Sequence, residues 1–519
     1  MLRSKGSRVL IITAAIITVG IASLVLARSS NAIESVMLFD EVMKKVRSEY
    51  VTRTDLDKLF EGAINGMLGT LDPHSQFLSK KQYDDLMVST HGSFGGLGIE
   101  IDIRNDWLTV IAPIEGTPAH RMGLQGGDRI VKIEDNSTRG ITMTEAVQKL
   151  RGKKGTEVTI TIQREGETEL LDYTIVRDNI KIKSVPFSSM LNDELGYVRL
   201  AGFSDDTADE LRRAIRELKQ DGMQKLIIDL RRNTGGLLTQ AIEVSEHFLE
   251  PGQTVVSTKG RRPEQNREYN AGSRAVGGDY PLIVLVDNQS ASASEIVAGA
   301  IQDLDRGLVV GLPTFGKGTV QSVMRLAGGG ALKLTTAKYY TPSGRNINKE
   351  DDPNDESAIV LPEDEMPDSS RTYYTAGGRA VYGGGGIRPD IEIEPEDMPK
   401  MASRLARKGL VFEFAVHYVA DHTDIREDFG EGPALFENFK EFLAEKEFEY
   451  TEKEFAEGEE FIGVMLRSEV ARKVWGNHAA YTISLEGDSQ LKKTVDIISK
   501  VGTLSDLFAS AAQFSKVTE

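Results

Sequence analysis

The stretch LIVLVDNQSASASE at residues 282–295 combines an apolar strand with a turn of small residues and the start of a helical pattern. Small residues at such a strand-to-helix turn expose a side chain above the sheet edge. They also let a substrate carbonyl approach the N–H groups at the start of the helix. Ser292 is the side chain that this turn would present. By itself, Ser292 followed by Glu295 also fits an ordinary capping box.

A second strand-to-helix turn precedes the first along the chain, in the stretch DLRRNTGGL at residues 229–237. Its paired glycines, Gly235 and Gly236, would let a backbone N–H group point at a developing oxyanion. Strands alternate with helices in the sequence pattern from residue 196 onward. This alternation predicts α/β layers around both turns.

A third stretch, TFGKGTVQ at residues 314–321, places one lysine, Lys317, among small and apolar residues. Serine needs a base to take its proton, and none of the three stretches contains histidine, so a Ser-His-Asp triad is disfavoured. Lysine can replace histidine if apolar neighbours such as Phe315 and Val320 lower its pKa by about three units from about 10.4. By itself, Lys317 equally fits a solvated loop charge or a phosphate binder, although the glycine spacing of a P-loop is absent.

Between residues 91 and 177 the pattern changes to short strands with one helix at residues 143–150. A glycine-rich loop precedes the first strand. Successive N–H groups of such a loop can hold a terminal carboxylate, and the adjoining strand edge can accept an extended peptide. This loop, the segment that begins with TPA at residues 117–119, the stretch GDRI at residues 127–130 and the helix together resemble a PDZ domain over about 85 residues. A small β-barrel without a ligand is the alternative. The predicted peptide-binding residues are Gly96, Leu97, Gly98 and Ile99.

The amino-terminal end has three basic residues before an uncharged apolar run at residues 9–27. As a helix, this run would span roughly 28 Å, close to the ~30 Å hydrocarbon core of a bilayer. The basic residues predict that this end stays cytoplasmic and that the rest is exported. We therefore expect an anchor in the inner membrane or a cleaved signal peptide, and a body outside the cytoplasm, in a bacterial periplasm. A buried core helix is the alternative.

Composition excludes several classes of protein. The 519 residues carry a formal net charge of −17, which argues against a nucleic-acid binder with a basic footprint. The absence of cysteine excludes disulfide scaffolds, thiol nucleophiles and cysteine-based metal sites. The seven histidines have no metal-binding spacing, so we expect no metal and no cofactor.

These patterns predict a multidomain α/β protein. An acidic stretch with several prolines, at about residues 349–383, is predicted to be a surface insertion in the core. The predicted parts are a targeting segment at residues 1–32, amino-terminal helices at 33–90, the PDZ-like domain at 91–178, an α/β core at 179–398 and a helical carboxy-terminal region at 399–519.

Taken together, the stretches at residues 229–237, 290–296 and 314–321 resemble those of the carboxy-terminal processing peptidases, also called tail-specific proteases. They occur in the order of that family, and Lys317 follows Ser292 by 25 residues, as in that family. The resemblance extends over about residues 33–395 and includes the PDZ-like domain and the stretch YYTPSGR at residues 339–345. It implies a crotonase- or ClpP-like α/β peptidase core.

The resemblance also implies roles for individual residues. Ser292 would be the nucleophile, Lys317 would be its general base, and the reaction would pass through an acyl-enzyme. Ala293, with Gly235 or Gly236, would supply the N–H groups of the oxyanion hole. Two further positions match residues that orient the lysine in that family, Gln321 and Glu295.

The activity so implied is an endopeptidase that recognises unstructured, nonpolar carboxy termini of proteins and cleaves upstream of them. An activator or adaptor protein and self-association, through either end of the chain, are the other expected partners. Two rival functions stay open, a PDZ scaffold without turnover and a crotonase-like enzyme for acyl-CoA thioesters. An intact dyad argues against the first rival, and the export signal argues against the second. A cluster of apolar residues in the tail fits either self-association or a helical core: Phe436, Phe439, Phe442 and Leu443.

Overall fold

The computed structural model describes residues 33–272, 278–349, 372–422, 424–426, 429–430 and 433–514. The predicted membrane segment at residues 9–27 lies outside these residues, as does most of the predicted acidic insertion. Within the described residues, no helix is both long enough and apolar enough to cross a membrane. The chain divides into two compact units, Met1–Phe77 and Leu78–Glu519.

The described part of the first unit is mainly helical, and it ends as β1 (Gln76–Leu78) begins. The chain is helical over residues 33–49, and α2 (Leu56–Gly69) follows, capped by the Asp55 side chain, which accepts from the N–H groups of Asp57 and Lys58. This confirms the predicted amino-terminal helices. Large apolar side chains on these helices are exposed, among them Val36, Phe39, Val42, Phe60 and Met67.

The PDZ-like domain of the second unit follows α3 (Lys80–His91) and has an antiparallel sheet in the order β3-β4-β5-β7-β8, with β6 paired to β5. Its inward-facing side chains alternate along the strands, as Ile160 and Ile162 do on β7, because successive residues of a strand point to opposite faces. A two-stranded ribbon, β2 (Ser93–Gly96) with β9 (Asp178–Lys181), joins this domain to the core. The elements of the domain are β3 (Ile99–Arg104), β4 (Trp107–Pro113), α4 (Pro118–Arg121), β5 (Arg129–Ile133), β6 (Asn136–Ser137), α5 (Met143–Leu150), β7 (Glu157–Gln163) and β8 (Leu171–Val176).

The core is built on a six-stranded sheet in the order β10-β11-β12-β15-β16-β21, which is parallel except for the β10–β11 pair. Because the four central strands are buried on both faces, they are almost continuously apolar, as in LIVLV of β15. The strands are β10 (Phe187–Met190), β11 (Leu195–Arg199), β12 (Lys225–Asp229), β15 (Leu282–Val286), β16 (Leu308–Gly311) and β21 (Ile391–Glu392).

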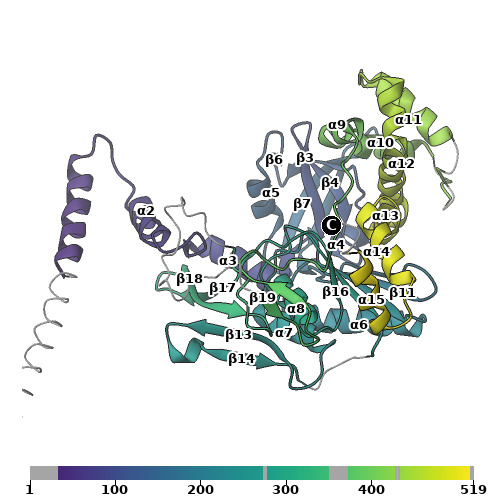
Figure 1. Ribbon diagram of the computed structural model, residues 1–519. Helices are drawn as coiled ribbons and strands as arrows, with labels where there is room; N and C mark the ends of the chain where they lie inside the picture. Colours follow the sequence, from purple (N-terminus) through teal and green to yellow (C-terminus); the bar gives the residue numbers. More distant parts are fainter. Residues whose placement is uncertain are drawn as a thin grey trace, which may run out of the picture. The chain divides into compact units, whose positions relative to one another are not determined.

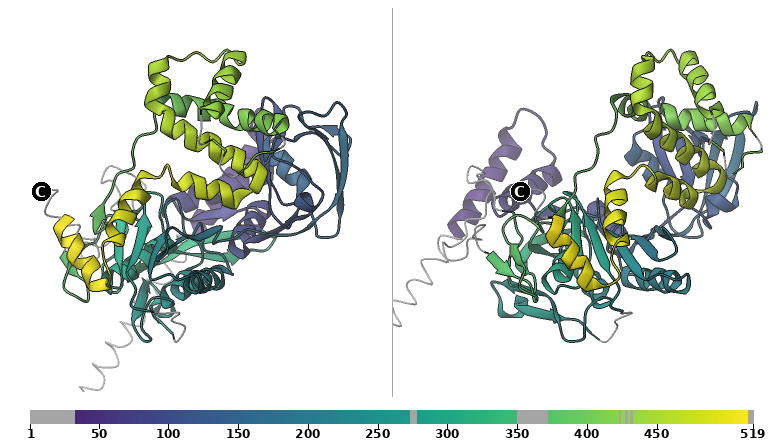
Figure 2. Two further views of the ribbon diagram at one scale, coloured as in Figure 1. Left: turned by 90° about the vertical axis from the view of Figure 1, so that its right-hand side faces the viewer. Right: turned by 45° about the vertical axis from the view of Figure 1, so that its right-hand side comes forward.

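Different parts of the chain cover the two faces of this sheet (Figure 1). Helices α6 (Thr207–Gln220), α7 (Leu238–Glu246) and α8 (Ala293–Asp303) pack on one face. The other face is covered by α14 (Ser489–Ser499) and α15 (Leu504–Phe514), which Figure 2 shows in yellow beside the sheet. Helices α14 and α15 therefore belong to the core that is built on this sheet.

An antiparallel sheet of β17, β18, β13 and β14 flanks the core, and a short hairpin of β19 and β20 follows the undescribed part of the insertion. Beyond the core, α9 to α12 pack around a separate apolar cluster, whereas Tyr481 and Leu485 of α13 pack against the cluster under the six-stranded sheet. Phe439, Phe442 and Leu443 are buried in that cluster, so they form a helical core and are not exposed for self-association. The elements are β13 (Thr254–Gly260), β14 (Arg267–Asn270), β17 (Thr319–Arg325), β18 (Ala331–Tyr340), β19 (Thr372–Tyr374), β20 (Ala380–Tyr382), α9 (Lys400–Lys408), α10 (Leu410–Asp421), α11 (Ala434–Glu445), α12 (Glu452–Trp475) and α13 (Asn477–Leu485).

Candidate active site

Ser292 lies in the turn between β15 and α8, immediately before the first residue of the helix. Its backbone has φ +55° and ψ −111°, a conformation that a residue with a side chain rarely adopts. The N–H of Ser292 donates to Glu295 Oε2 at 2.7 Å, which fixes this strained turn. Strained residues of this kind cluster at functional sites.

The glycine pair lies against this turn. A Cβ atom added to Gly235 would lie 2.9 Å from the backbone nitrogen of Ala293. A Cβ atom added to Gly236 would lie 2.1 Å from the carbonyl oxygen of Phe203. The N–H of Gly235 donates to Asn233 Oδ1 at 2.9 Å, whereas Ala293 is the first residue of α8, where N–H groups have no partner within the helix. The turn therefore brings the N–H of Ala293 beside the glycine loop.

Lys317 lies in the loop between β16 and β17 and is half-buried. Of its two predicted apolar neighbours, Val320 is partly buried and packs against the core. Phe315 is 52% exposed, so the prediction that its ring buries the lysine is wrong. The reason is that the loop turns the ring outward while it buries Thr314 and Gly316 on either side.

Glu295 connects the turn of Ser292 to the loop of Lys317. Its Oε2 accepts from the backbone N–H groups of Ser292 (2.7 Å) and Lys317 (2.9 Å). Its Oε1 accepts from the Thr314 hydroxyl (2.6 Å) and the Gly316 N–H (2.7 Å). The residue is fully buried, and this burial raises the pKa of its carboxyl although the hydrogen bonds oppose the rise. Glu295 therefore fixes the main chain of the turn at Ser292 and of the loop at Lys317.

Tyr339, on β18, contacts the same two segments from the other direction. Its hydroxyl donates to the carbonyl oxygens of Lys317 and Ser292, the latter at 3.3 Å. Its side chain is buried, and this burial, with the charge of Glu295, raises the pKa of the phenol well above 10. Sequence reasoning missed this residue, because only the stretch YYTPSGR around it was noticed. No local pattern shows which carbonyl groups a strand tyrosine will meet.

One cavity of about 830 Å³ brings most of the predicted site residues together. Gln321 lines it, and its amide nitrogen donates to Thr319 Oγ1 at 2.9 Å. Glu295 is buried and does not line the cavity. The predicted site residues that line the cavity are Gly235, Gly236, Ser292, Ala293, Lys317 and Gln321.

The predicted peptide-binding loop belongs to the PDZ-like domain. Leu97 is buried in the domain core, and its carbonyl accepts from the N–H of Ala119 at 3.0 Å. The carbonyl of Gly98 accepts from the Thr117 hydroxyl at 3.0 Å, and Gly98 has φ +79°. Gly96 ends β2 and Ile99 begins β3, so the loop joins the ribbon to the first strand of the domain. Its role in peptide binding stays a prediction.

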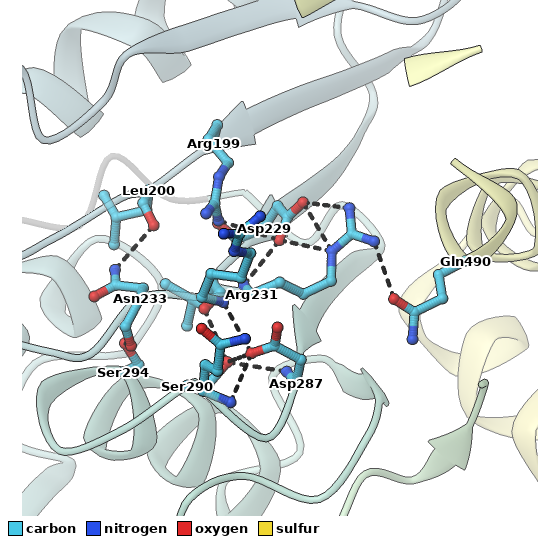
Figure 3. A network of polar contacts seen from close by, with 12 residues as sticks. Arg199, Leu200, Asp229, Arg231, Asn233, Asp287, Ser290, Ser294 and Gln490 are labelled. Carbon is cyan, nitrogen blue, oxygen red and sulfur yellow. Dashed lines mark hydrogen bonds and ion pairs between the residues drawn. The ribbon is translucent and has the colours of Figure 1, made fainter. Parts of the chain in front are cut away.

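Figure 3 shows a polar network around Asn233, which lies two residues before Gly235. The side-chain amide of the buried Asn233 donates to the carbonyl oxygen of Leu200 at 2.9 Å. The backbone carbonyl oxygen of Asn233 accepts from the Ser294 hydroxyl at 2.8 Å. The N–H of Arg232, whose φ is +56°, donates to Asp287 Oδ1 at 2.8 Å. Sequence reasoning quoted this stretch but gave no role to Asn233.

Among the residues that the structure describes, no group of three or more His, Cys, Asp or Glu side chains is arranged to hold a metal ion. The groups that the cavity offers for chemistry are its serine, its lysine and backbone N–H groups.

Comparison with known proteins covers the chain from its amino-terminal part to its helical tail. The model of peptidase family S41 matches residues 194–357, and that of a PDZ domain matches residues 109–164. The model described as "Probable PDZ-protease, C-terminal helical domain" matches residues 401–457, and "Activating protease CtpB N-terminal domain" matches residues 24–82. A carboxy-terminal-processing protease of Bartonella bacilliformis is 44% identical over 321 residues, which are 61% of this chain and 73% of that protein.

This chain belongs to peptidase family S41. A probable CtpA-like serine protease of Staphylococcus aureus is 36% identical over 310 residues, which are 60% of this chain but only 62% of that protein. The solved structure of a photosystem II D1 C-terminal processing protease is 27% identical, with a TM-score of 0.37, over 71% of this chain and 96% of that one. The predicted family, the PDZ domain, the α/β peptidase core and the serine-type peptidase class are confirmed.

Proposed function

We propose that this S41 peptidase is an endopeptidase in which Ser292 and Lys317 form the catalytic dyad, and that it cleaves protein substrates upstream of their carboxy termini outside the cytoplasm. The observation that carries the proposal is the single cavity lined by both side chains and by the glycine pair. Glu295 supports it further, since one buried carboxylate fixes the backbone of both dyad residues.

The proposed reaction starts when neutral Lys317 takes the hydroxyl proton of Ser292, whose oxygen attacks the carbonyl carbon of the peptide bond. The proton then passes to the leaving nitrogen as the C–N bond breaks, and the downstream fragment departs. Water then loses a proton to Lys317 and attacks the ester carbonyl carbon, and the proton passes from Lys317 to the Ser292 oxygen as the ester C–O bond breaks and the acid product leaves. Lys317 thus carries a proton in both halves of the cycle, whereas Ser292 is the nucleophile in the first half and the leaving group in the second.

The proposed oxyanion hole consists of the N–H groups of Ala293 and Gly236. Gly235 is not proposed as an oxyanion donor, because its N–H already donates to Asn233 Oδ1. The contribution of Gly235 is its missing side chain, which would otherwise collide with Ser292 and Ala293. Removing one oxyanion donor typically lowers kcat by about 10²–10³-fold.

Substrate capture is assigned to the loop at Gly96, Leu97, Gly98 and Ile99, which would bind a terminal carboxylate while β3 pairs with the nonpolar tail. Proteins with unstructured, nonpolar carboxy termini are therefore the proposed substrates. An activator or adaptor protein, self-association and an inner-membrane anchor at residues 9–27 belong to the same proposal. The exposed apolar side chains of the amino-terminal helices support self-association.

The test is incubation of the full-length protein with a disordered model protein that ends in apolar residues, with products identified by mass spectrometry. Ser292→Ala and Lys317→Ala should each abolish cleavage. Lys333→Ala is the matched control, because Lys333 is a second lysine that lines the same cavity, and it should keep most of the activity. Cleavage that survives Ser292→Ala would overturn the dyad. Hydrolysis of an acyl-CoA thioester but no protein would favour the crotonase-like alternative.

A further inference from the structure

The amino-terminal end of α14 meets the carboxyl end of β12 through a polar contact. Asp488 caps α14, accepting from the N–H of Leu491 at 2.9 Å. The same carboxylate accepts from the guanidinium of Arg231 at 3.0 and 2.5 Å. Gln490 adds a third acceptor for Arg231 at 3.1 Å, as Figure 3 shows. A residue near the end of the chain therefore binds the stretch that leads to the glycine pair.

Arg231 also binds Asp229, which is 1% exposed. The guanidinium donates from Nε to both carboxylate oxygens at 3.1 Å and from Nη2 at 2.6 Å. Asp229 accepts further from the Tyr197 hydroxyl at 2.7 Å, and Arg199 lies 3.4 Å from it. The cluster thus holds two guanidinium groups and two carboxylates. Its charges balance only while Asp488 is in place.

Residues 231–235 connect this cluster to the proposed oxyanion hole, and side-chain hydrogen bonds fix their backbone. The N–H of Arg231 donates to Asp229 Oδ1 at 2.9 Å, and the next N–H, that of Arg232, donates to Asp287. Asn233 then holds the N–H of Gly235. The main chain from Asp229 to Gly235 has little freedom to absorb a change at Arg231 without moving the glycines.

We infer that Asp488 is a positioning residue for the oxyanion hole, and that the carboxy-terminal helix α14 holds the glycine loop in its catalytic geometry through Arg231. The inference rests on the proposed function of Gly236 and Ala293. It assigns a role in catalysis to the end of the chain, far in sequence from the dyad.

The polar contact is not required to dock the helix. Leu491, Ile497 and Ile498 of α14 are buried against the sheet, so apolar packing already holds α14 there. Buried ion pairs contribute little net stability, because losing water from the charges offsets most of their attraction. What a bidentate guanidinium contact does supply is a fixed geometry.

The decisive variant is Asp488→Asn, because asparagine caps a helix as well as aspartate does but carries no charge. The matched control is Glu486→Gln, two residues earlier, which removes an ion pair with Arg467 inside the helical region. We expect Asp488→Asn to lower kcat about tenfold with little change in KM, since small displacements of catalytic groups have effects of this order or larger. Labelling of Ser292 by a fluorophosphonate should slow in the same proportion, and Glu486→Gln should match the parent.

A double-mutant cycle separates positioning from general stability. Arg231→Lys keeps the charge but loses the bidentate geometry, and its effect on kcat should not add to that of Asp488→Asn. Hydrogen exchange at residues 230–236 should also be faster in Asp488→Asn. A kcat within twofold of the parent, an equal loss in Glu486→Gln, or unchanged exchange would overturn the inference. If the parent itself neither cleaves protein nor reacts with the fluorophosphonate, the proposed function has failed instead.

Discussion

Two buried carboxylates, those of Glu295 and Asp229, differ in the groups that donate hydrogen bonds to them. Glu295, on the side of the dyad, accepts from three backbone N–H groups and one hydroxyl, all of them neutral. Asp229, behind the glycine loop, accepts from Arg231, near Arg199. Burial raises the pKa of both, but the charge and hydrogen bonds of Arg231 outweigh it at Asp229, whose pKa falls. Neutral donors give precise main-chain placement, whereas cationic donors give a carboxylate that stays ionised.

Among the changes that test this comparison of the two carboxylates, the largest effect should come from removing the acceptors of Glu295. In Glu295→Gln the amide nitrogen would face N–H or O–H donors, leaving buried donors unsatisfied at about 1–3 kcal/mol each. We expect kcat to fall by about 100-fold, because the backbone of Ser292 and Lys317 would shift together. Steady-state kinetics on a protein substrate would measure this fall.

The control for this variant is Glu210→Gln. Glu210 Oε2 likewise accepts a backbone N–H, that of Val185 at 2.9 Å, but outside the cavity. It should leave kcat within about twofold of the parent. Equal losses in both variants would mean that Glu295 supports only the fold.

Two buried tyrosines, Tyr339 and Tyr197, allow a second test of the difference between the surroundings of Glu295 and Asp229. Tyr339 binds the carbonyl groups of Lys317 and Ser292, whereas Tyr197 binds Asp229. Tyr339→Phe should lower kcat about tenfold with an unchanged KM. Tyr197→Phe should lower the free energy of unfolding by about 1 kcal/mol with kcat within twofold, since Asp229 keeps its cationic partners. Kinetics and urea unfolding of both variants would decide, and the reverse pattern would contradict the assignment.

The sequence allowed prediction of those features whose chemistry is local. Ser292 and Glu295 share one turn, Gly235 and Gly236 share another, and the α/β alternation follows from the apolar strands. Tyr339 could not be predicted, because its partners lie 22 and 47 residues away and depend on how β18 pairs.

The contact between Arg231 and Asp488 spans 257 residues, which no local pattern can reveal. The sequence also could not show that α14 and α15 cover one face of the sheet. Amphipathic helices in the tail show that an apolar face will be buried, but not against which partner.

The two carboxylates should also give opposite pH dependences of stability. The pKa of Glu295 is raised above its ordinary value of 4.5, so its contribution is present below that value and is lost as the pH rises through the raised pKa. The pKa of Asp229 is lowered from 3.8, so its contribution is present above that value and is lost as the pH falls through the lowered pKa.

Urea unfolding across the acidic range would measure both contributions, as the difference in unfolding free energy between the parent and each neutral variant. This difference should shrink with rising pH for Glu295→Gln and grow with rising pH for Asp229→Asn. Slopes of the same sign would show that the neutral and cationic donors do not distinguish the two carboxylates.

The smallest effect is expected at Phe315, the residue that the sequence placed against the lysine. Its ring is 52% exposed, so Phe315→Ala removes little packing and should leave kcat/KM within about twofold of the parent. Val320→Ala is the informative partner, because Val320 lines the cavity and packs against the core. It should lower kcat/KM more than Phe315→Ala does. If instead Phe315→Ala were the more damaging change, the exposed ring would have to meet the substrate, and the apolar neighbour of the lysine would be supplied only when a peptide is bound.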